Sequence, residues 1–275
     1  MEQDLNSAAW YSHGNILFSL GHYEGAIAGY DKVLATQSDL YEVWNNRGYA
    51  LENLSRYQEA IASFDQALNI HPEFALAWHG RGIVLAKLGR YEEALTNFNK
   101  TLKLNPTDLK ARYNQGKALA HLGRHDEALS SFDRVLASDP NEYKAWYSRS
   151  KVLVSLNQLQ AALTSLNQTL AINPFCDYAW NYRGTLLLKL GHYDEAIASF
   201  DQSLQIKPNN PEAWYSKARC YALKGETQLA LSYLQRAIKL NPPLYRTLAK
   251  GDVHFRSLLS SQQLQTLLKR TSQAS

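Results

Sequence analysis

The sequence has 275 residues, of which 45% are apolar and 20% charged, and its formal net charge is +4. This apolar content supports a folded core and excludes a chain that is disordered throughout. The two cysteines, Cys176 and Cys220, are too few for a disulfide framework or a four-ligand zinc site.

The N-terminal segment MEQDLNSAAW has neither the basic region nor the apolar region of a signal peptide. No stretch of the sequence approaches the roughly 18 uninterrupted apolar residues that a transmembrane helix needs. We therefore expect no membrane insertion and a cytoplasmic location.

Tryptophan and proline recur with a period of 34 residues. Arg112 stands at the one position that the tryptophan series skips, and the six tryptophans are Trp10, Trp44, Trp78, Trp146, Trp180 and Trp214. Proline follows the same step from Pro72 to Pro242 without a break. Such an internal period predicts a repeat protein in place of one or two globular domains.

Seven repeats of 34 residues follow a lead-in at 1–6, and each repeat begins three residues before the tryptophan position. They span 7–40, 41–74, 75–108, 109–142, 143–176, 177–210 and 211–244. Positions within a repeat are numbered 1–34 from here on.

Each repeat is predicted to form two helices. Apolar or small residues at positions 3, 4, 7 or 8, 11 and 14 have helical spacing, and glycine at position 15 (or Ser55, Asn157) is expected to end this first helix. Alanine at position 20 and leucine or isoleucine at positions 21 and 28 predict a second helix, which proline at position 32 ends. Glycine at position 8 and alanine at position 20 are expected to let the paired helices approach closely, with Trp at 4 and an aromatic residue at 24 filling the wider space.

The pattern resembles the tetratricopeptide repeat (TPR) family. The third repeat carries it fully, with Trp78, Gly82, Leu85, Gly89, Tyr91, Ala94, Phe98 and Pro106. The resemblance implies an all-α, right-handed superhelical solenoid of antiparallel helix pairs, with a concave groove lined by the first helices. The departures are few: Arg112 replaces the tryptophan in the fourth repeat, and the first repeat has Ser38 in place of the terminal proline. The fifth repeat has Ser150, Asn157, Leu159 and Leu166 where Gly, Gly, Tyr and Phe are usual.

The period fades after Leu244, although apolar residues keep helical spacing. The last repeat of a solenoid needs a cap with a polar outer side, so we expect capping helices at 245–270 and a frayed tail at 271–275.

The sequence offers little support for an enzyme. It has no phosphate-binding loop of the GxxxxGK[ST] type, and the glycines are explained by packing and turns. His121 and His125 flank Gly123 at an expected turn, so they are not expected to share one helical face as a metal pair would. Adjacent carboxylates at positions 18 and 19 recur at the start of the second helix, where they complement the helix dipole. We expect no catalytic residues, no metal and no cofactor.

The resemblance places positions 2, 5, 6, 9, 12 and 13 in the concave groove, and we call the side chains at these positions the groove face. The candidate partner-binding residues on it are Tyr11, Asn15, Asn45, Asn46, Tyr49, His79, Lys87, Lys110, Tyr113, Asn114, Lys117, Lys144, Tyr147, Lys151, Tyr178, Asn181, Tyr182, Tyr215 and Arg219. Tyrosine combines a large contact area with a hydrogen-bonding tip, which suits peptide binding. The alternative is that tyrosine at position 5 packs against the neighbouring helix.

Charge is distributed unevenly along the chain. Residues 1–74 carry 3 basic and 10 acidic side chains, whereas residues 75–275 carry 26 and 15. Repeats three to six place lysines and no acid on the groove face, which predicts an acidic partner segment. The alternative is a row of solvated lysines. The carboxylate clamp that some TPR domains use is absent: Asn15 and Asn46 match two of its positions, but Tyr11, Leu76 and Gly80 do not.

The sequence therefore favours a non-catalytic scaffold or adaptor that binds an acidic peptide or helix of another protein. Self-assembly into a homo-oligomer through the groove or the ends is one alternative. Nucleic-acid binding by the basic half is another, disfavoured because there is no base-stacking module or dense arginine run. An accessory domain that acts with a separate enzyme is a third.

Overall fold

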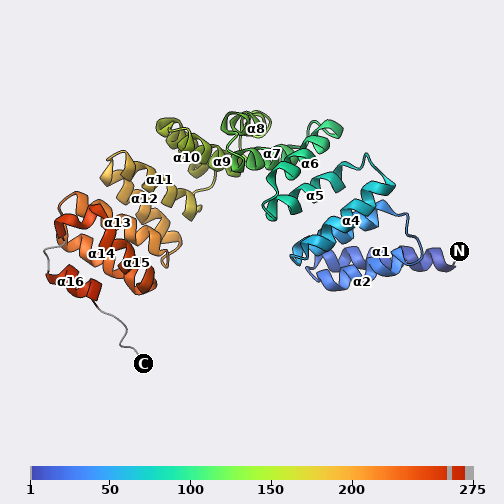
Figure 1. Ribbon diagram of the computed structural model, residues 1–275, viewed down its shortest axis with the longest axis horizontal. Helices are drawn as coiled ribbons and strands as arrows, with labels where there is room; N and C mark the ends of the chain where they lie inside the picture. The colour runs from blue at the N-terminus through green and yellow to red at the C-terminus, as the bar shows by residue number, and fades with distance from the viewer. Residues whose placement is uncertain (1, 259–261, 270–275) are drawn as a thin grey trace, which may run out of the picture. The chain divides into compact units, whose positions relative to one another are not determined.

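The computed structural model describes residues 2–258 and 262–269, and over this range it is all-helical, without strands (Figure 1). The chain forms two compact units, residues 1–148 and 149–275, which are described separately. The first contains α1 (Glu2–Ser19), α2 (Tyr23–Leu34), α3 (Tyr41–Asn53), α4 (Tyr57–Ile70), α5 (Ala75–Lys87), α6 (Tyr91–Leu104), α7 (Leu109–His121), α8 (His125–Ser138) and the start of α9 (Tyr143–Ser155). The second contains the rest of α9, α10 (Leu159–Ile172), α11 (Asp177–Lys189), α12 (Tyr193–Ile206), α13 (Pro211–Leu223), α14 (Thr227–Leu240), α15 (Pro242–Gly251), a 3₁₀ helix η1 (Val253–Leu258) and α16 (Gln262–Lys269).

Consecutive helices pack as pairs within each unit, as in α1 with α2 and α13 with α14, and each pair packs on the next. The all-helical prediction from the 34-residue period is confirmed. Residues 2–6 continue α1, so the expected lead-in joins the first helix.

Glycine at position 8 packs against the aromatic ring at position 24 of its own repeat. A Cβ on Gly48 would lie 2.7 Å from Cε1 of Phe64, and one on Gly116 would lie 2.8 Å from Cε1 of Phe132. Real Cβ atoms do not approach so closely, because cores are already packed to crystal density. The two columns are therefore coupled, which explains the departures. The fifth repeat has Ser150 with Leu166 and the seventh has Ala218 with Leu234, so a larger residue at position 8 accompanies a smaller one at position 24.

The residue at position 15 has a left-handed backbone where the first helix ends. The five glycines there have φ between 75° and 82°, and Ser55 and Asn157 adopt φ of 59° and 57°. Glycine carries no steric penalty in this conformation, whereas serine does and asparagine pays less. The sequence-based prediction that these residues end the helix agrees with the backbone at all seven positions.

The tryptophan and proline columns are joined by a hydrogen bond. The indole Nε1 of Trp78 donates to the carbonyl of Pro72 at 2.8 Å, and Trp146 donates to Pro140 at 2.9 Å. Arg112 replaces tryptophan but makes the same bond, from its Nη2 to the carbonyl of Pro106 at 2.9 Å. The bond ties the start of one repeat to the end of the preceding one.

A polar ladder that the sequence reading missed joins adjacent repeats. The side chain at position 7 reaches position 25 of the preceding repeat, as Arg47 does to Asp31 and Arg81 to Asp65, each at 2.7 Å. In the C-terminal unit, Lys217 pairs with Asp201 at 2.5 Å. Burial lowers the pKa of Lys217, but the hydrogen bond to Asp201, the charge of Asp201 and the contact with Tyr233 together hold the pKa above its usual value. This ladder identifies the side of each first helix that faces the preceding repeat.

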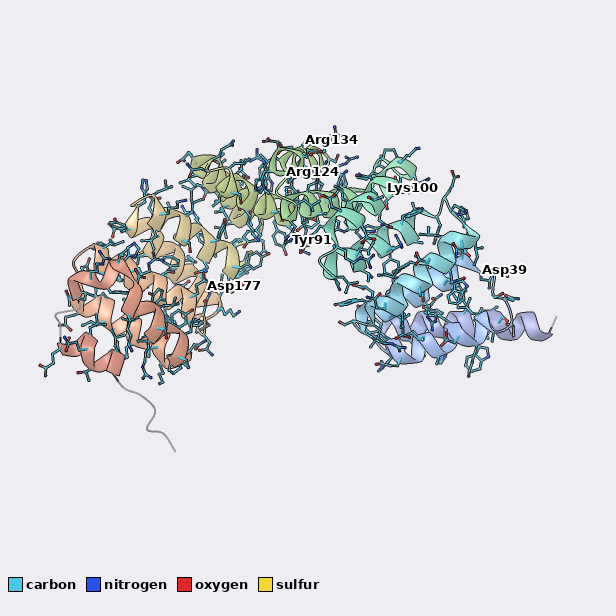
Figure 2. The ribbon with its side chains drawn as sticks, in the orientation of Figure 1. Asp39, Tyr91, Lys100, Arg124, Arg134 and Asp177 are labelled. Carbon is cyan, nitrogen blue, oxygen red and sulfur yellow. The ribbon has the colours of Figure 1, made fainter. Side chains whose placement is uncertain are left out.

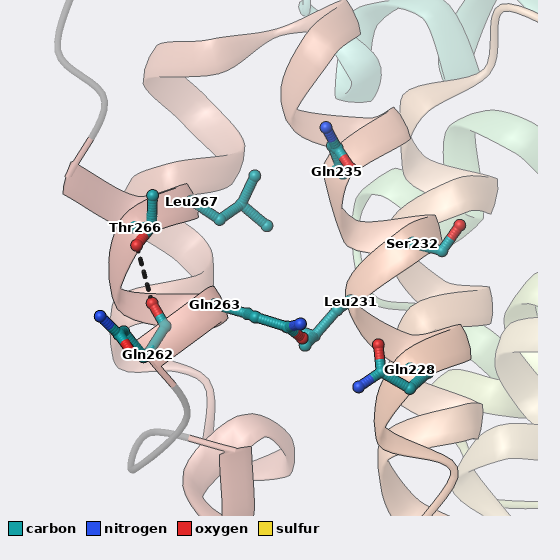
Figure 3. A pocket seen from close by; sticks show the side chains of 8 residues that line it. All are labelled: Gln228, Leu231, Ser232, Gln235, Gln262, Gln263, Thr266 and Leu267. Atoms are coloured by element: carbon teal, nitrogen blue, oxygen red, sulfur yellow. Dashed lines mark hydrogen bonds between the residues drawn. The ribbon is translucent and has the colours of Figure 1, made fainter.

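The segment after the repeats packs on α14. Tyr245, Phe255, Leu258, Leu264 and Leu268 are buried together with the apolar side of that helix. The helix α15 begins at Pro242, earlier than the expected cap at 245, because Asn241 caps it by accepting a hydrogen bond from the backbone N–H of Leu244. A cavity of about 510 Å³ lies between α14 and α16 (Figure 3). Residues 270–275, which include the expected tail, lie outside the described residues.

Candidate functional site

The groove face of the N-terminal unit begins with a hydrogen-bonded network. Asn46 Nδ2 donates to the hydroxyl of Tyr11 at 3.0 Å and to Oδ1 of Asn15 at 3.2 Å. Asn15 Oδ1 also accepts from the buried hydroxyl of Tyr30 at 2.8 Å, and burial raises the pKa of Tyr30 to about 12. Three of the candidate residues, Tyr11, Asn15 and Asn46, are thus brought together.

Positions 5 and 6 of successive repeats are bonded further along the same face. Asn114 Nδ2 lies 3.1 Å from Nε2 of His79, and the hydroxyls of Tyr113 and Ser148 are 3.1 Å apart. An amide nitrogen only donates, so His79 Nε2 accepts and the neutral ring carries its proton on Nδ1. Burial lowers the pKa of His79, which favours this neutral form.

Several candidate residues have little exposed surface. Asn45, His79, Asn181 and Tyr215 are 3%, 7%, 9% and 7% exposed, respectively. Tyr49 is half-buried and donates to the carbonyl of Leu76 at 3.1 Å. Of these side chains, His79, Tyr49 and Tyr215 bond to residues of neighbouring elements, as in the alternative interpretation of the groove tyrosines. Tyr147 and Tyr182 are half-buried, and Tyr178 is exposed.

The lysines of the groove face are exposed. In the N-terminal unit they are Lys87, Lys110, Lys117 and Lys144, and in the C-terminal unit Lys151 and Lys189. Lys87 is paired with Glu52, the acidic residue at position 12 of the preceding repeat. Lys117 lies over the ring of Tyr113, with Nζ 5.6 Å from its centroid. Outside the groove face, Arg124, labelled in Figure 2, pairs with Glu127 at 2.7 Å.

The C-terminal unit has two cavities on its groove face, of about 790 Å³ and 640 Å³. Thr185 and Arg219 line both of them, so the two cavities adjoin. Tyr215 and Ser216 of α13 line the larger cavity, and Lys189 of α11 lines the smaller. Close by on α11, the buried Oδ1 of Asn181 has no hydrogen-bond partner among the described residues.

The segment after α15 places a carboxylate on this face. Asp252 Oδ2 accepts from the hydroxyl of Tyr215 at 2.8 Å and lies 3.3 Å from Nε of Arg219. Asp252 Oδ1 lies 2.5 Å from Nδ1 of His254, which also contacts Arg219. Burial works against the charged form, but the hydrogen bonds from His254 and Tyr215 hold the pKa of Asp252 below its usual value. Sequence reasoning missed Asp252 and His254 because they lie beyond the periodic region.

Candidate catalytic chemistry is sparse among the described residues. Burial raises the pKa of Cys176, and it raises that of Cys220 to about 12, so both thiols are unreactive. No group of three or more His, Cys, Asp or Glu side chains in the described ranges is placed to hold a metal ion. His121 ends α7 and stacks on Tyr91 at 4.3 Å, whereas His125 begins α8.

None of the described helices has the length and apolar character needed to cross a membrane.

Comparison of the chain with known protein families identifies the family that has this 34-residue step and these paired helices. The tetratricopeptide repeat family matches residues 79–143, 147–211 and 183–244, and related TPR models match residues 41–74 and 14–55. The chain belongs to the tetratricopeptide repeat family. Proteins built of TPR motifs are generally non-catalytic scaffolds. Comparison with curated proteins gave no match.

Solved TPR structures share the fold. YrrB, described as a TPR protein with an unusual peptide-binding site, is 26% identical, with a TM-score of 0.56 over 66% of this chain and 93% of its own. A TPR protein from Parabacteroides merdae ATCC 43184 is 18% identical, with a TM-score of 0.69 over 90% of this chain and 98% of its own. The APC/C hetero-tetramer Cut9-Hcn1 contains a chain that is 18% identical, with a TM-score of 0.66 over 94% of this chain and 48% of that one.

Proposed function

We propose that this protein is a non-catalytic TPR scaffold or adaptor whose groove face binds an acidic peptide or helix of another protein. The observation that carries the proposal is the contact of Asp252 with Tyr215 and Arg219. A carboxylate from a segment outside the repeats is held there by a tyrosine hydroxyl and a guanidinium of the groove face. An acidic partner would use the same chemistry at the other tyrosine and lysine positions.

The C-terminal unit offers the space for such a partner. Its two adjoining cavities carry Arg219 and Lys189, and exposed Tyr178 lies at position 2 of the same repeat as Lys189.

The N-terminal unit contributes exposed lysines. Lys110 and Lys117 are seven residues apart on α7, so they lie on one side of that helix. Lys144 occupies the position of Lys110 in the next repeat. The relatives support the class of function, since YrrB is described as peptide-binding and Cut9 is found in a complex with Hcn1.

The test replaces Lys110, Lys117, Lys144 and Lys151 with glutamate. A fluorescein-labelled peptide rich in Asp and Glu serves as the probe, and binding is measured by fluorescence anisotropy. We expect the affinity to fall by about a hundredfold or more while circular dichroism stays helical, because four attractive contacts become repulsive. The matched control changes Lys100, Lys103, Lys207 and Lys239, which lie outside the groove face, and should retain most of the affinity.

Equal loss in the control would show that net charge, and not the groove face, governs binding, and unchanged affinity in the groove variant would contradict the proposal. Self-assembly would instead appear in light scattering as an oligomer that the groove variant disrupts. Nucleic-acid binding would appear as a salt-dependent gel shift with DNA or RNA.

A further inference from the structure

The first repeat exposes a row of four side chains, and at two of these positions the residues of every other repeat are buried. Positions 3, 7, 10 and 14 lie within an arc of about 60° on a helix, because each residue advances by roughly 100°. In the first repeat the row consists of Ala9, His13 and Ile16 of α1 and of Leu20 directly after it, all exposed, with Ile16 at 56% and Leu20 at 65%. We call these four residues the α1 row. The corresponding residues at positions 3 and 10 are buried in every other repeat: Val43 and Ala50, Ala77 and Val84, Ala111 and Ala118, Ala145 and Val152, Ala179 and Leu186, Ala213 and Cys220.

The polar ladder shows what covers this row elsewhere. Position 7 belongs to the row. In later repeats the side chain at this position contacts position 25, on the second helix of the preceding repeat. Arg47 contacts Asp31 in this way, and Lys217 contacts Asp201. Positions 21, 25 and 28 of that second helix lie on one side of it. The covering element is therefore a helix with an apolar residue, a polar residue four positions later, and a second apolar residue three positions after that.

All seven second helices fit this description. They have Leu or Ile at positions 21 and 28, and Asp, Asn or Gln at position 25. In α12 the three residues are Ile197, Asp201 and Leu204, where both apolar side chains are less than 9% exposed.

We propose that the α1 row is a docking site for an amphipathic helix of another protein with the pattern Ile/Leu-x₃-Asp-x₂-Leu. Its apolar residues would cover Ala9, Ile16 and Leu20, and its aspartate would lie beside His13. The proposal rests on the interfaces between the other repeats of this chain. There, a second helix with this pattern covers the residues at the same positions of the next first helix.

A second copy of the chain is a poorer occupant. Within the described residues, the matching rows of the second helices are already covered by the next repeat. The last of them, on α14, is covered by the segment after the repeats, which leaves Leu231 and Ile238 only 8% and 3% exposed. A second copy would have to uncover one of these rows before it could bind.

The α1 row is separate from the groove face. The groove-face positions are centred roughly 130° away from the row around the same helix, as the helical repeat requires. Binding at the two places can therefore be tested independently.

The test uses the full chain and a fluorescein-labelled peptide of residues 193–206, held helical by a lactam bridge on its exposed side because so short a helix is marginal alone. We expect saturable binding that Ile16→Asp and Leu20→Asp each weaken at least about tenfold, since each places a charge in an apolar contact. The control variant Leu76→Asp alters a comparably exposed leucine on the groove face and should bind the peptide as the wild type does.

Charge reversal tests the contact at His13. The peptide variant Asp201→Lys should bind more weakly than the original peptide, and the protein variant His13→Glu should restore its binding. Failure of the wild-type chain to bind the peptide, or equal binding by Ile16→Asp, would overturn the proposal. It would also be overturned if light scattering showed a wild-type dimer that Ile16→Asp converts to a monomer, because a second copy would then be the occupant.

Discussion

The ring of Phe200 rests against the backbone of Gly184, where a Cβ would lie only 2.6 Å from Cε1 of the ring. The same pair of positions is occupied by Ser150 and Leu166 in the fifth repeat and by Ala218 and Leu234 in the seventh. All four of these residues have no exposed surface. The size of one residue therefore limits the size of the other.

This relationship predicts a compensating pair of substitutions. Gly184→Ala should lower the free energy of unfolding by about 1–3 kcal/mol through overpacking, and Phe200→Leu by about 1–2 kcal/mol through a cavity. The double variant should be more stable than the sum of the two losses predicts, because it recreates the pair found in the seventh repeat. Urea unfolding followed by circular dichroism gives the coupling energy, and simple additivity would contradict the argument.

The left-handed backbone at Ser55 and Asn157 predicts that replacing either residue with glycine stabilises the protein, and by unequal amounts. Ser55→Gly should raise the free energy of unfolding by about 1 kcal/mol, because glycine has no Cβ penalty at positive φ. Asn157→Gly should gain less, since asparagine tolerates this conformation better than serine does. Thermal unfolding of the two single variants checks the order, and a larger gain at Asn157 would refute it.

The environment of Arg112 predicts that replacing it with tryptophan, the residue usual at this position, stabilises the protein. Burial and the nearby Arg134 both lower the pKa of Arg112, so its charge sits in an unfavourable place. Arg112→Trp keeps a donor for the Pro106 carbonyl and adds apolar area, so it should gain about 1 kcal/mol. Arg112→Ala should lower the free energy of unfolding by about 1 kcal/mol, because it removes the hydrogen bond to the Pro106 carbonyl. If Arg112→Trp proved less stable than the wild type in urea, a requirement for the guanidinium would be indicated.

His79 predicts a loss of stability in mild acid. Its pKa is lowered in the folded protein, so the unfolded chain binds a proton more readily. The stabilisation of the folded protein by neutral His79 is therefore fully present above the ordinary pKa of histidine. It is lost as the pH falls from that value through the lower pKa that His79 has in the folded protein. His79→Gln can still accept from Asn114 without titrating, and should therefore show a smaller fall in melting temperature between pH 7.5 and pH 5.5. An identical fall in both proteins would show that His79 is not responsible.

Much of the fold could be predicted because a repeat shows each local requirement several times. The turn at position 15 and the proline that follows the second helix in repeats two to seven are short-range features, and the 34-residue period aligns them. The sequence predicts the aromatic residue at position 24 in the wider space between the helices, whereas the structure packs its ring directly against the glycine at position 8. The coupling of tryptophan to the proline carbonyl was not predicted, although both columns were visible, because it depends on a backbone carbonyl that the sequence does not display.

The candidate site was predicted less well. The groove-face positions were chosen from the family pattern, which does not say whether a side chain is exposed or used between repeats. The structure gives His79 a partner in Asn114 and buries Tyr215 beneath Asp252, whereas Lys110, Lys117 and Lys144 remain exposed. Asp252 and His254 could not have been found from the period, since they follow the last repeat.

The sequence by itself determined the repeat length, the two helices of each repeat and where each first helix ends, because these depend on backbone conformation and on helical spacing. Only the tertiary structure decided which side chains link adjacent repeats, which groove positions stay exposed and that the α1 row is uncovered. Those outcomes depend on contacts between residues far apart along the chain, such as Asp252 with Tyr215, and such contacts exist only once the helices are stacked.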